Sequence, residues 1–412
     1  MKLLTMRTLD KWVGLPACWA LTLLRPLLDR FRRPPPPDPR RILFLKLAEQ
    51  GSTVLAHAAI HHAVARVGRE NVYFLVFEEN RFILDALEVI PEDNVFTVSS
   101  AGLPRFLATL AAAIRGIRAR QIDATIDLEF FARSTALIAF CGGATRRVGL
   151  HPFAGGGPYR GNLMTHRVHF NPHIHTSDMF QVMAAALHEP SASFPASAAQ
   201  PPATPMALPV FVPRPGEADA VRTLLHAAAG EHVQRMILFN PSCGDMLPLR
   251  KWESSRYVEL AQRMIEYDPA LTIGFTGASA EQDEIGRLAA AVGSPRCLSL
   301  AGRTTMRQLL VLYTMTDVVV TNDSGPAHFA ALTAADVVTL FGPETPELFG
   351  ARTPRSHIIW TGLACSPCVN AYNNRRSGCH NNLCMQSIGV DRVFDEVRRV
   401  YDRRMVPVSE GH

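Results

Sequence analysis

Residues 318–350 read VVVTNDSGPAHFAALTAADVVTLFGPETPELFG, and this stretch decides the fold. It begins with an apolar strand, Val318–Val320, and polar residues follow where the strand ends. Pro326 predicts a helix start, because proline lacks the N–H that a first helical turn leaves unbonded. A second apolar strand, Val337–Phe341, ends in another glycine turn. Strand, helix and strand in this order indicate a parallel sheet whose strand ends carry functional residues.

The polar residues between these strands are typical of a site for a phosphate and a sugar. Backbone N–H groups at a helix start attract phosphate, and Gly325 lets a ligand approach closely. Asp323 can accept hydrogen bonds from sugar hydroxyls, and His328 lies within reach of a diphosphate. Taken singly, Asp323 and Ser324 fit a helix cap and His328 a surface residue. Their ordered combination favours the ligand site.

The size and composition of the chain predict two ordinary globular domains. It has 412 residues, of which 47% are hydrophobic and 19% charged, and this length exceeds that of a typical single domain. A net charge of +5 does not call for a nucleic-acid partner. The composition therefore excludes disordered and fibrous classes and favours enzymes or binding proteins with buried cores.

Strands and helices alternate in both halves of the chain. The strands expected in the first half are 41–47, 72–77, 95–98 and 124–128, and those in the second are 236–239, 271–275, 318–320 and 337–341. We therefore predict an α/β protein with two Rossmann-like, doubly wound domains facing a central cleft. The assigned regions are an N-terminal segment 1–39, a first domain 40–189, a proline-rich linker 190–215, a second domain 216–385 and a C-terminal helix and tail 386–412.

The N-terminal segment suits a membrane interface. Its uncharged stretch, Trp12–Leu24, is shorter than the roughly 20 apolar residues that span a bilayer. Asp10 and the lack of an A-x-A cleavage site argue against a secretory signal. Trp12 and Trp19 with flanking basic residues are typical of a helix lying on an anionic membrane. Packing against the protein's own core fits these residues equally well.

Several motifs resemble glycosyltransferase family 9, the heptosyltransferases, whose fold is GT-B. Residues 323–328 resemble the family's D-[ST]-G-x-x-H pattern, and Phe341–Pro343 resembles its F-G-P-T pattern with Glu344 inserted before Thr345. Three further elements resemble family motifs: residues 239–244 with 250–252 and 256–257, residues 300–304, and residues 277–278 with Glu281. The resemblance runs from about residue 41 to the C-terminal helix and is most specific in the second half.

The resemblance implies an inverting glycosyltransferase that binds a nucleotide-diphospho-sugar, such as ADP-heptose, in the second domain. A lipid-linked or saccharide acceptor would bind the first domain, as in lipopolysaccharide core assembly, at the inner face of the cytoplasmic membrane. No metal or cofactor is expected for catalysis, and Arg250 takes the place of the family's phosphate-binding lysine. The implied donor-binding residues are Ser242, Arg250, Lys251, Glu281, Asp323, Ser324, Gly325 and His328.

The first domain departs from the family at the expected catalytic base. In the family the first glycine loop ends in Gly-Asp, whose carboxylate deprotonates the acceptor, whereas here Gly51 precedes Ser52. Serine is not a general base at neutral pH. Glu49 in the same loop and His57 in the next helix are the substitutes that we consider, although Glu49 equally fits a surface charge. The departure also supports an alternative function, a catalytically weakened nucleotide-sugar-binding or envelope-assembly protein.

Two further groups of residues are candidates for binding. Arg146 precedes a glycine- and histidine-rich stretch, 149–175, and Arg160 lies within it. Both are candidate contacts to an anionic glycolipid, and a surface loop is the alternative. Near the C-terminus, four cysteines follow a C-x2-C-x10-C-x4-C spacing: Cys365, Cys368, Cys379 and Cys384. The spacing suits a structural zinc ion, or two disulfides in an oxidising compartment. We expect a structural rather than a catalytic role.

Overall fold

The computed structural model divides the chain into two compact units. It describes residues 3–32, 34–151, 158–190, 200, 204–230, 233–244, 247–373 and 375–405. The N-terminal unit comprises Met1–Met206 and Asn370–Arg376, and the C-terminal unit comprises Ala207–Val369 and Ser377–His412. Residues 191–199 and 201–203 of the proline-rich linker expected from the sequence, and the glycines 155–157, lie outside the described residues.

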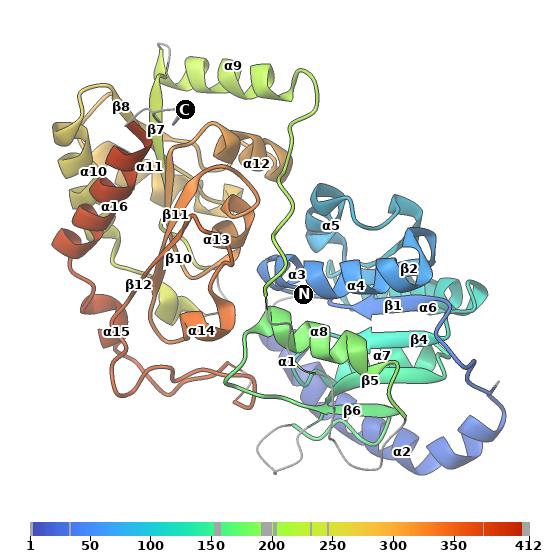
Figure 1. Cartoon of the computed structure of the whole chain (residues 1–412). Helices are drawn as coiled ribbons and strands as arrows, with labels where there is room; N and C mark the ends of the chain where they lie inside the picture. Colours follow the sequence, from blue (N-terminus) through green and yellow to red (C-terminus); the bar gives the residue numbers. More distant parts are fainter. Residues whose placement is uncertain are drawn as a thin grey trace. The chain divides into compact units, whose positions relative to one another are not determined.

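The N-terminal unit contains a six-stranded parallel sheet in the order β3-β2-β1-β4-β5-β6 (Figure 1). Its strands are β1 Ile42–Leu45, β2 Val72–Phe77, β3 Val95–Val98, β4 Ala124–Asp127, β5 Arg146–His151 and β6 His166–His169. Its helices are α1 Leu3–Trp12, α2 Gly14–Arg30, α3 Gln50–Leu55, α4 His57–Val67, α5 Phe82–Leu87, α6 Leu103–Ala119, α7 Arg133–Cys141 and α8 Thr176–Ala186. Ile42 pairs with Val72 on one side and Ala124 on the other, so the strand order reverses between β1 and β4.

The C-terminal unit repeats this plan in the order β12-β11-β10-β7-β8-β9. Its strands are β7 Arg235–Asn240, β8 Leu271–Phe275, β9 Cys297–Ser299, β10 Val318–Asn322, β11 Asp336–Phe341 and β12 Ser356–Trp360. Its helices are α9 Glu217–Ala229, α10 Ser254–Tyr267, α11 Gln282–Ala291, α12 Met306–Thr314, α13 Gly325–Ala330, α14 Pro346–Phe349, α15 Leu383–Gln386 and α16 Val390–Met405. The order reverses between β7 and β10, where ligands bind in sheets of this type.

The central strands form because they are apolar and buried on both faces. Every residue of β1, β2, β10 and β11 is buried, which is the pattern of parallel strands covered by helices. In the C-terminal unit, α10 and α16 pack together over the sheet. Each sheet therefore holds the loops at its strand ends on a rigid core.

The structure differs from the sequence prediction in its strands and in one domain boundary, and β5, β6, β9 and β12 were not predicted. After β1 the chain forms two helices, α3 and α4, which Ala56 separates. Residues 370–376, which we assigned to the second domain, belong to the N-terminal unit. Aromatic packing explains this assignment, because the Tyr372 ring stacks 5.5 Å from Phe131 and meets Phe170 edge-on at 5.4 Å. Among the described residues, no helix is long and apolar enough to cross a bilayer.

Candidate functional site

Asn322 organises the strand ends of the C-terminal unit. This buried residue closes β10, and its side-chain oxygen accepts a hydrogen bond from the Trp252 backbone N–H at 3.1 Å. Its amide nitrogen donates to the Pro241 carbonyl at 2.8 Å, which ties the loop after β7 to the end of β10. The Trp252 indole donates to the Ile388 carbonyl at 2.9 Å. The two loops at the switch point are therefore fixed together before any ligand arrives.

Arg250 lies between two buried carboxylates at this point. It closes a short 3-10 helix, Pro248–Arg250, and its Nη1 donates to the Asp323 carbonyl at 2.8 Å. Its Nη2 lies 3.2 Å from a Glu344 carboxylate oxygen, and its Nε lies 3.7 Å from Asp323 Oδ2. The side chain is 11% exposed, and within the described part of the chain its Nε has no hydrogen-bond partner. A positioned cation with an unused donor suits an anionic ligand.

His328 adds a second unused nitrogen to this group. It is buried in α13, and its Nδ1 has no hydrogen-bond partner among the residues that the structure describes. Burial, and then the charge of Arg250, lower the pKa of His328 to about 4. The imidazole is therefore neutral at pH 7 and can donate one hydrogen bond to a diphosphate. α13 has only six residues, so the positive end of its helix dipole contributes little. Arg250 is therefore the main positive group of the site.

The other expected donor residues make mostly local contacts. Ser324 Oγ donates to the Asn322 carbonyl at 3.1 Å, and Glu281 accepts the Ala278 backbone N–H at 2.8 Å. At Gly325 an added Cβ would lie 3.3 Å from the Phe329 ring, so the position is tight. The Ser242 carbonyl lies at 3.5 Å from the Asn322 amide nitrogen.

Lys251 differs from its neighbour Arg250. Its ammonium group pairs with Glu284 on α11, and both side chains are well exposed. It does not contact the Asp323 and Glu344 carboxylates that hold Arg250. The structure therefore brings Arg250, Asp323 and His328 together and places Lys251 and Glu281 in separate contacts.

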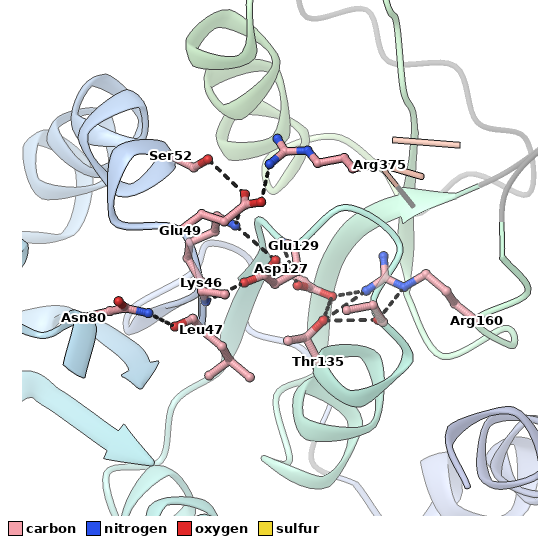
Figure 2. A network of polar contacts seen from close by, with 12 residues as sticks. Lys46, Leu47, Glu49, Ser52, Asn80, Asp127, Glu129, Thr135, Arg160 and Arg375 are labelled. Atoms are coloured by element: carbon pink, nitrogen blue, oxygen red, sulfur yellow. Dashed lines mark hydrogen bonds and ion pairs between the residues drawn. The ribbon is translucent and has the colours of Figure 1, made fainter. Parts of the chain in front are cut away.

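In the N-terminal unit, the loop after β1 forms an ion-pair network (Figure 2). Glu49 has a left-handed backbone, with φ 67°, and its carboxylate accepts from Lys46 Nζ at 3.3 Å. Lys46 Nζ also lies 3.0 Å from Glu129, which accepts the Ala48 N–H at 3.0 Å. Arg375, from the returning segment 370–376, pairs with the other oxygen of Glu49. Burial favours a lower pKa for Lys46, but Glu129 and Glu49 raise it above the ordinary value.

Ser52 and His57 lie on the two helices that follow this loop. Ser52 is buried in the first turn of α3, and its hydroxyl donates to Glu49 at 3.2 Å. His57 begins α4, where burial, and then the nearby His61, lower its pKa to about 4. The structure therefore brings Ser52 to Glu49, whose charge is engaged by Lys46 and Arg375, and places His57 on the next helix.

Arg160 and Arg146 stabilise the N-terminal unit and do not form an open acceptor surface. Arg160 is buried, donates to the carbonyls of Ala132 and Leu150, both at 2.9 Å, and pairs with the buried Asp127 at the end of β4. Arg146 donates to the Leu187 carbonyl at 2.7 Å and to the polyproline segment at Pro36, at 2.9 Å. These contacts occupy both guanidinium groups, so the acceptor role that we expected for them finds no support in the structure.

The four C-terminal cysteines do not form a preassembled metal site. Cys384 is buried and Cys365 exposed, while Cys379 donates to the Asn381 carbonyl at 3.0 Å. Within the described ranges, no group of three or more His, Cys, Asp or Glu residues is arranged to hold a metal ion. The zinc site stays a prediction from the cysteine spacing.

Sequence reasoning missed several residues of these two clusters. Glu344 was noted only as an insertion, although its position between Pro343 and Thr345 was a visible signal. Lys46 lies at the end of the predicted strand 41–47, and Glu129 directly follows the predicted strand 124–128, so these strand ends could have placed them together. Arg375 had no such signal, because its contact with Glu49 joins positions 326 residues apart.

The comparisons with known proteins agree with the motifs and the fold. The chain is 29% identical over 127 residues to lipopolysaccharide heptosyltransferase 2 of Escherichia coli K12, an alignment that covers 30% of the chain. The chain spans only about a third, 36%, of the length of that curated relative.

Solved structures match over nearly the whole chain. The structure of E. coli ADP-heptose heptosyltransferase II has a TM-score of 0.69 at 17% identity, covering 89% of this chain and all, 100%, of that one. E. coli heptosyltransferase WaaC with ADP-2-deoxy-2-fluoro heptose has a TM-score of 0.59 at 15% identity, covering 87% of this chain and 99% of that one. These likenesses show the GT-B heptosyltransferase fold. The family model for glycosyltransferase family 9 (heptosyltransferase) matches residues 110–377, and the chain therefore belongs to this family.

Proposed function

We propose that this protein is an inverting glycosyltransferase. It transfers a heptose-type sugar from a nucleotide-diphospho-sugar to a lipid-linked or saccharide acceptor, as in lipopolysaccharide core assembly. The observation that carries this proposal is the arrangement of Arg250 between Asp323 and Glu344, beside His328, at the strand ends of a family 9 fold. The solved relative named above with an ADP-sugar analogue supports an ADP-linked heptose as the donor class.

The chemistry follows from these groups. An acceptor hydroxyl oxygen forms a bond to the anomeric carbon as the bond to the diphosphate oxygen breaks, so the anomeric configuration inverts. The nucleoside diphosphate leaves with the bonding electron pair, and the hydroxyl proton passes to a base. Arg250 Nε and a neutral His328 offer hydrogen bonds to the charge that builds on the leaving oxygens. Asp323 binds sugar hydroxyls and holds Arg250. No metal is needed for this step.

Glu49 is the proposed base. Its carboxylate lies in the loop where the family carries an aspartate, one helical turn before Ser52, which contacts it at 3.2 Å. His57 begins the next helix, α4, and is buried there. Glu129 is the other carboxylate of the network, but it holds the Ala48 N–H and Lys46 and so shapes the loop.

A weakened donor-binding protein is the second candidate function. Two features of the ion-pair network around Glu49 favour this function. Ser52 stands where the family carries its aspartate base, and Lys46 and Arg375 both pair with Glu49. Such a protein would bind nucleotide-sugar without transfer. The two functions differ in turnover, not in donor affinity.

One experiment separates these functions. The full-length protein is incubated with ADP-heptose and a soluble inner-core saccharide without lipid, and both nucleotide release and saccharide mass are followed. We expect stoichiometric formation of ADP and heptosylated saccharide. ADP-heptose binding by calorimetry without product would favour the binding protein, and the absence of both binding and product would contradict the donor site.

We also place the enzyme at the inner face of the cytoplasmic membrane, where a lipid-linked acceptor would be presented. A structural zinc ion at Cys365, Cys368, Cys379 and Cys384 is a further proposal that the C-x2-C spacing supports. Metal analysis of the purified protein tests it. One zinc per chain, lost when Cys368 and Cys379 are changed to serine, is the expected result, and a metal-free wild-type protein would contradict it.

A further inference from the structure

The helix α2 has the reverse of the polarity expected for a helix on a water-exposed surface. Its polar side chains face the body of the N-terminal unit, and its large apolar side chains face outward. Positions at helical spacing form the inner stripe: Gly14, Cys18, Thr22, Arg25, Asp29 and the following Arg32. Such spacing keeps all six positions on one side of the helix. Figure 1 shows α2 as part of the N-terminal unit, and its contacts are with α1 and α7.

The inner stripe is bonded to the protein at several points. The Asn162 backbone N–H donates to Thr22 Oγ1 at 2.9 Å. Arg25 donates to the Met164 carbonyl at 3.3 Å, and Arg32 donates to the Phe140 carbonyl at 2.7 Å. At Gly14 an added Cβ would lie 2.9 Å from the Arg133 Cβ, so the helix start is tightly packed. The helix is therefore fixed to the unit rather than tethered loosely beside it.

The outer face carries large apolar side chains. Exposed members at this face and its ends are Trp12 at 71%, Trp19 at 60%, Leu23 at 62%, Leu27 at 54% and Phe31 at 83%. Leu15, Pro16, Trp19 and Tyr159 line an open hollow of about 470 Å³ in this face. Soluble proteins seldom expose apolar patches of this extent without a partner.

The charges around this face select the partner. Between Trp12 and Leu24 there is no charged residue; Lys11 and Arg25 bound this stretch, and the exposed Arg30 ends the helix. Lys11 Nζ lies 5.4 Å from the centre of the Trp12 ring. Tryptophans, leucines and basic end residues on a helix too short to span are the composition of interfacial helices on anionic lipid.

We propose that the outer face of α2, with Trp12 and Tyr159, inserts into the headgroup and upper acyl region of an anionic bilayer, with α2 parallel to the membrane plane. This proposal rests on the proposed function only for the identity of the membrane. Because Thr22, Arg25 and Arg32 fix the helix, the bilayer binds the N-terminal unit in one orientation. That orientation would present a lipid-linked acceptor to the unit in a constant direction.

The test uses substitutions on the outer face, because deletion of residues 1–33 would also uncover α7. Full-length protein is sedimented with vesicles of phosphatidylethanolamine and phosphatidylglycerol, without donor or acceptor. Leu27→Glu should weaken binding about tenfold or more, since one buried leucine is lost and a charge enters lipid. Leu107→Glu on α6 is the matched control, because Leu107 is also 54% exposed, and it should bind like the wild type.

A second measurement needs no variant. Addition of the same vesicles should shift the emission of the exposed Trp12 and Trp19 to shorter wavelength. The proposal is overturned if the wild type neither sediments nor shifts, if both glutamate variants lose binding equally, or if the wild type is a dimer without lipid that Leu27→Glu dissociates. Failure here leaves the lipid-free transfer assay unaffected, so the two proposals are tested separately.

Discussion

The two units share one sheet plan but carry different polar clusters at the point where the strand order reverses. In the C-terminal unit, Arg250 Nε and His328 Nδ1 are buried nitrogens with no hydrogen-bond partner within the described residues, although Nε lies 3.7 Å from Asp323 Oδ2. In the N-terminal unit, two cations, Lys46 and Arg375, pair with Glu49, and Lys46 also pairs with Glu129. The C-terminal cluster therefore has nitrogen atoms that can still hydrogen-bond to a ligand. In the N-terminal cluster the charged groups pair with one another.

This contrast shows where the chain follows its family and where it departs. The C-terminal cluster has the aspartate and histidine of the family pattern, with Arg250 where the family carries lysine and with Glu344 inserted. The loop after β1 has Ser52 where the family carries aspartate, and it forms an ion-pair network that includes Arg375, from the other half of the sequence. The C-terminal cluster is thus the one whose chemistry is easier to assign, and the N-terminal cluster is the one that experiments must resolve.

The largest effect is expected from Glu49→Gln. This change keeps the shape of the side chain and removes its basicity, so turnover should fall about 10² to 10⁴-fold if Glu49 is the base. Donor affinity by calorimetry should stay the same, because the C-terminal cluster is unchanged. Turnover is measured as ADP release with a saccharide acceptor.

Glu129→Gln and His57→Asn are the controls for this result. Glu129 shares Lys46 with Glu49, so an equal loss in both glutamine variants would assign the effect to the network rather than to a base. His57→Asn should turn over at nearly the wild-type rate. If Glu49→Gln is fully active, the base lies elsewhere, and a large gain from Ser52→Asp would then show that the family's position is still usable.

The next largest effect is expected from Arg250→Ala in the other cluster. Loss of a charge-assisted contact costs about 1.5–3 kcal/mol, so affinity for ADP-heptose should fall roughly 10- to 150-fold. Arg250→Lys should restore part of the affinity, because it returns the charge without the planar donor set. Thermal unfolding with and without ADP reports whether the fold survives. Wild-type affinity in Arg250→Ala would exclude this residue from the donor site.

Most of the fold could be predicted from the sequence because its central strands are strongly apolar. The strands 72–77, 95–98 and 271–275 have the bounds that the sequence predicted. The strand β5 and the edge strands β6, β9 and β12 were missed because arginine, histidine and serine interrupt their apolar pattern, as in His166–His169. Their pairing with a neighbouring strand supplies what the local sequence lacks.

The candidate site could be predicted only where it is local in sequence. Asp323 and His328 lie within one strand–helix turn, so their spacing alone indicates a shared site. The contacts of Arg160 with Asp127 and of Arg375 with Glu49 depend on tertiary folding. No sequence pattern indicates these contacts. The structure therefore gives Arg160 a buried structural role, where the sequence had suggested a contact to a glycolipid.

Acid should destabilise both units through one buried histidine in each. His57 and His328 have a pKa of about 4 in the folded protein, below the value of about 6.5 in an unfolded chain. The unfolded state therefore binds more protons as the pH falls below about 6.5, and stability is lost toward pH 4. At pH 5 each histidine should cost about 2 kcal/mol relative to pH 8.

Variants of the two histidines assign this acid sensitivity to each unit. His57→Gln and His328→Gln should each remove part of the difference in unfolding free energy between pH 8 and pH 5, measured by urea titration. The exposed His380→Gln is the control and should change nothing. An acid sensitivity that persists unchanged in the double variant would show that other groups cause it.

The smallest effect is expected from Lys251→Ala, beside Arg250. The two residues are neighbours in sequence, and the family resemblance assigned both to the donor site. Arg250 is 11% exposed between two carboxylates, whereas Lys251 is 38% exposed and pairs with Glu284 at the surface. Exposed ion pairs contribute about 0.2–1 kcal/mol. The free energy of unfolding should therefore change by less than about 1 kcal/mol, and donor affinity by less than about fivefold. Calorimetry with ADP-heptose, side by side with Arg250→Ala, measures the difference. Equal losses in the two variants would mean that Lys251 leaves Glu284 to reach the bound diphosphate, and the contrast between the two neighbours would then hold only for the ligand-free protein.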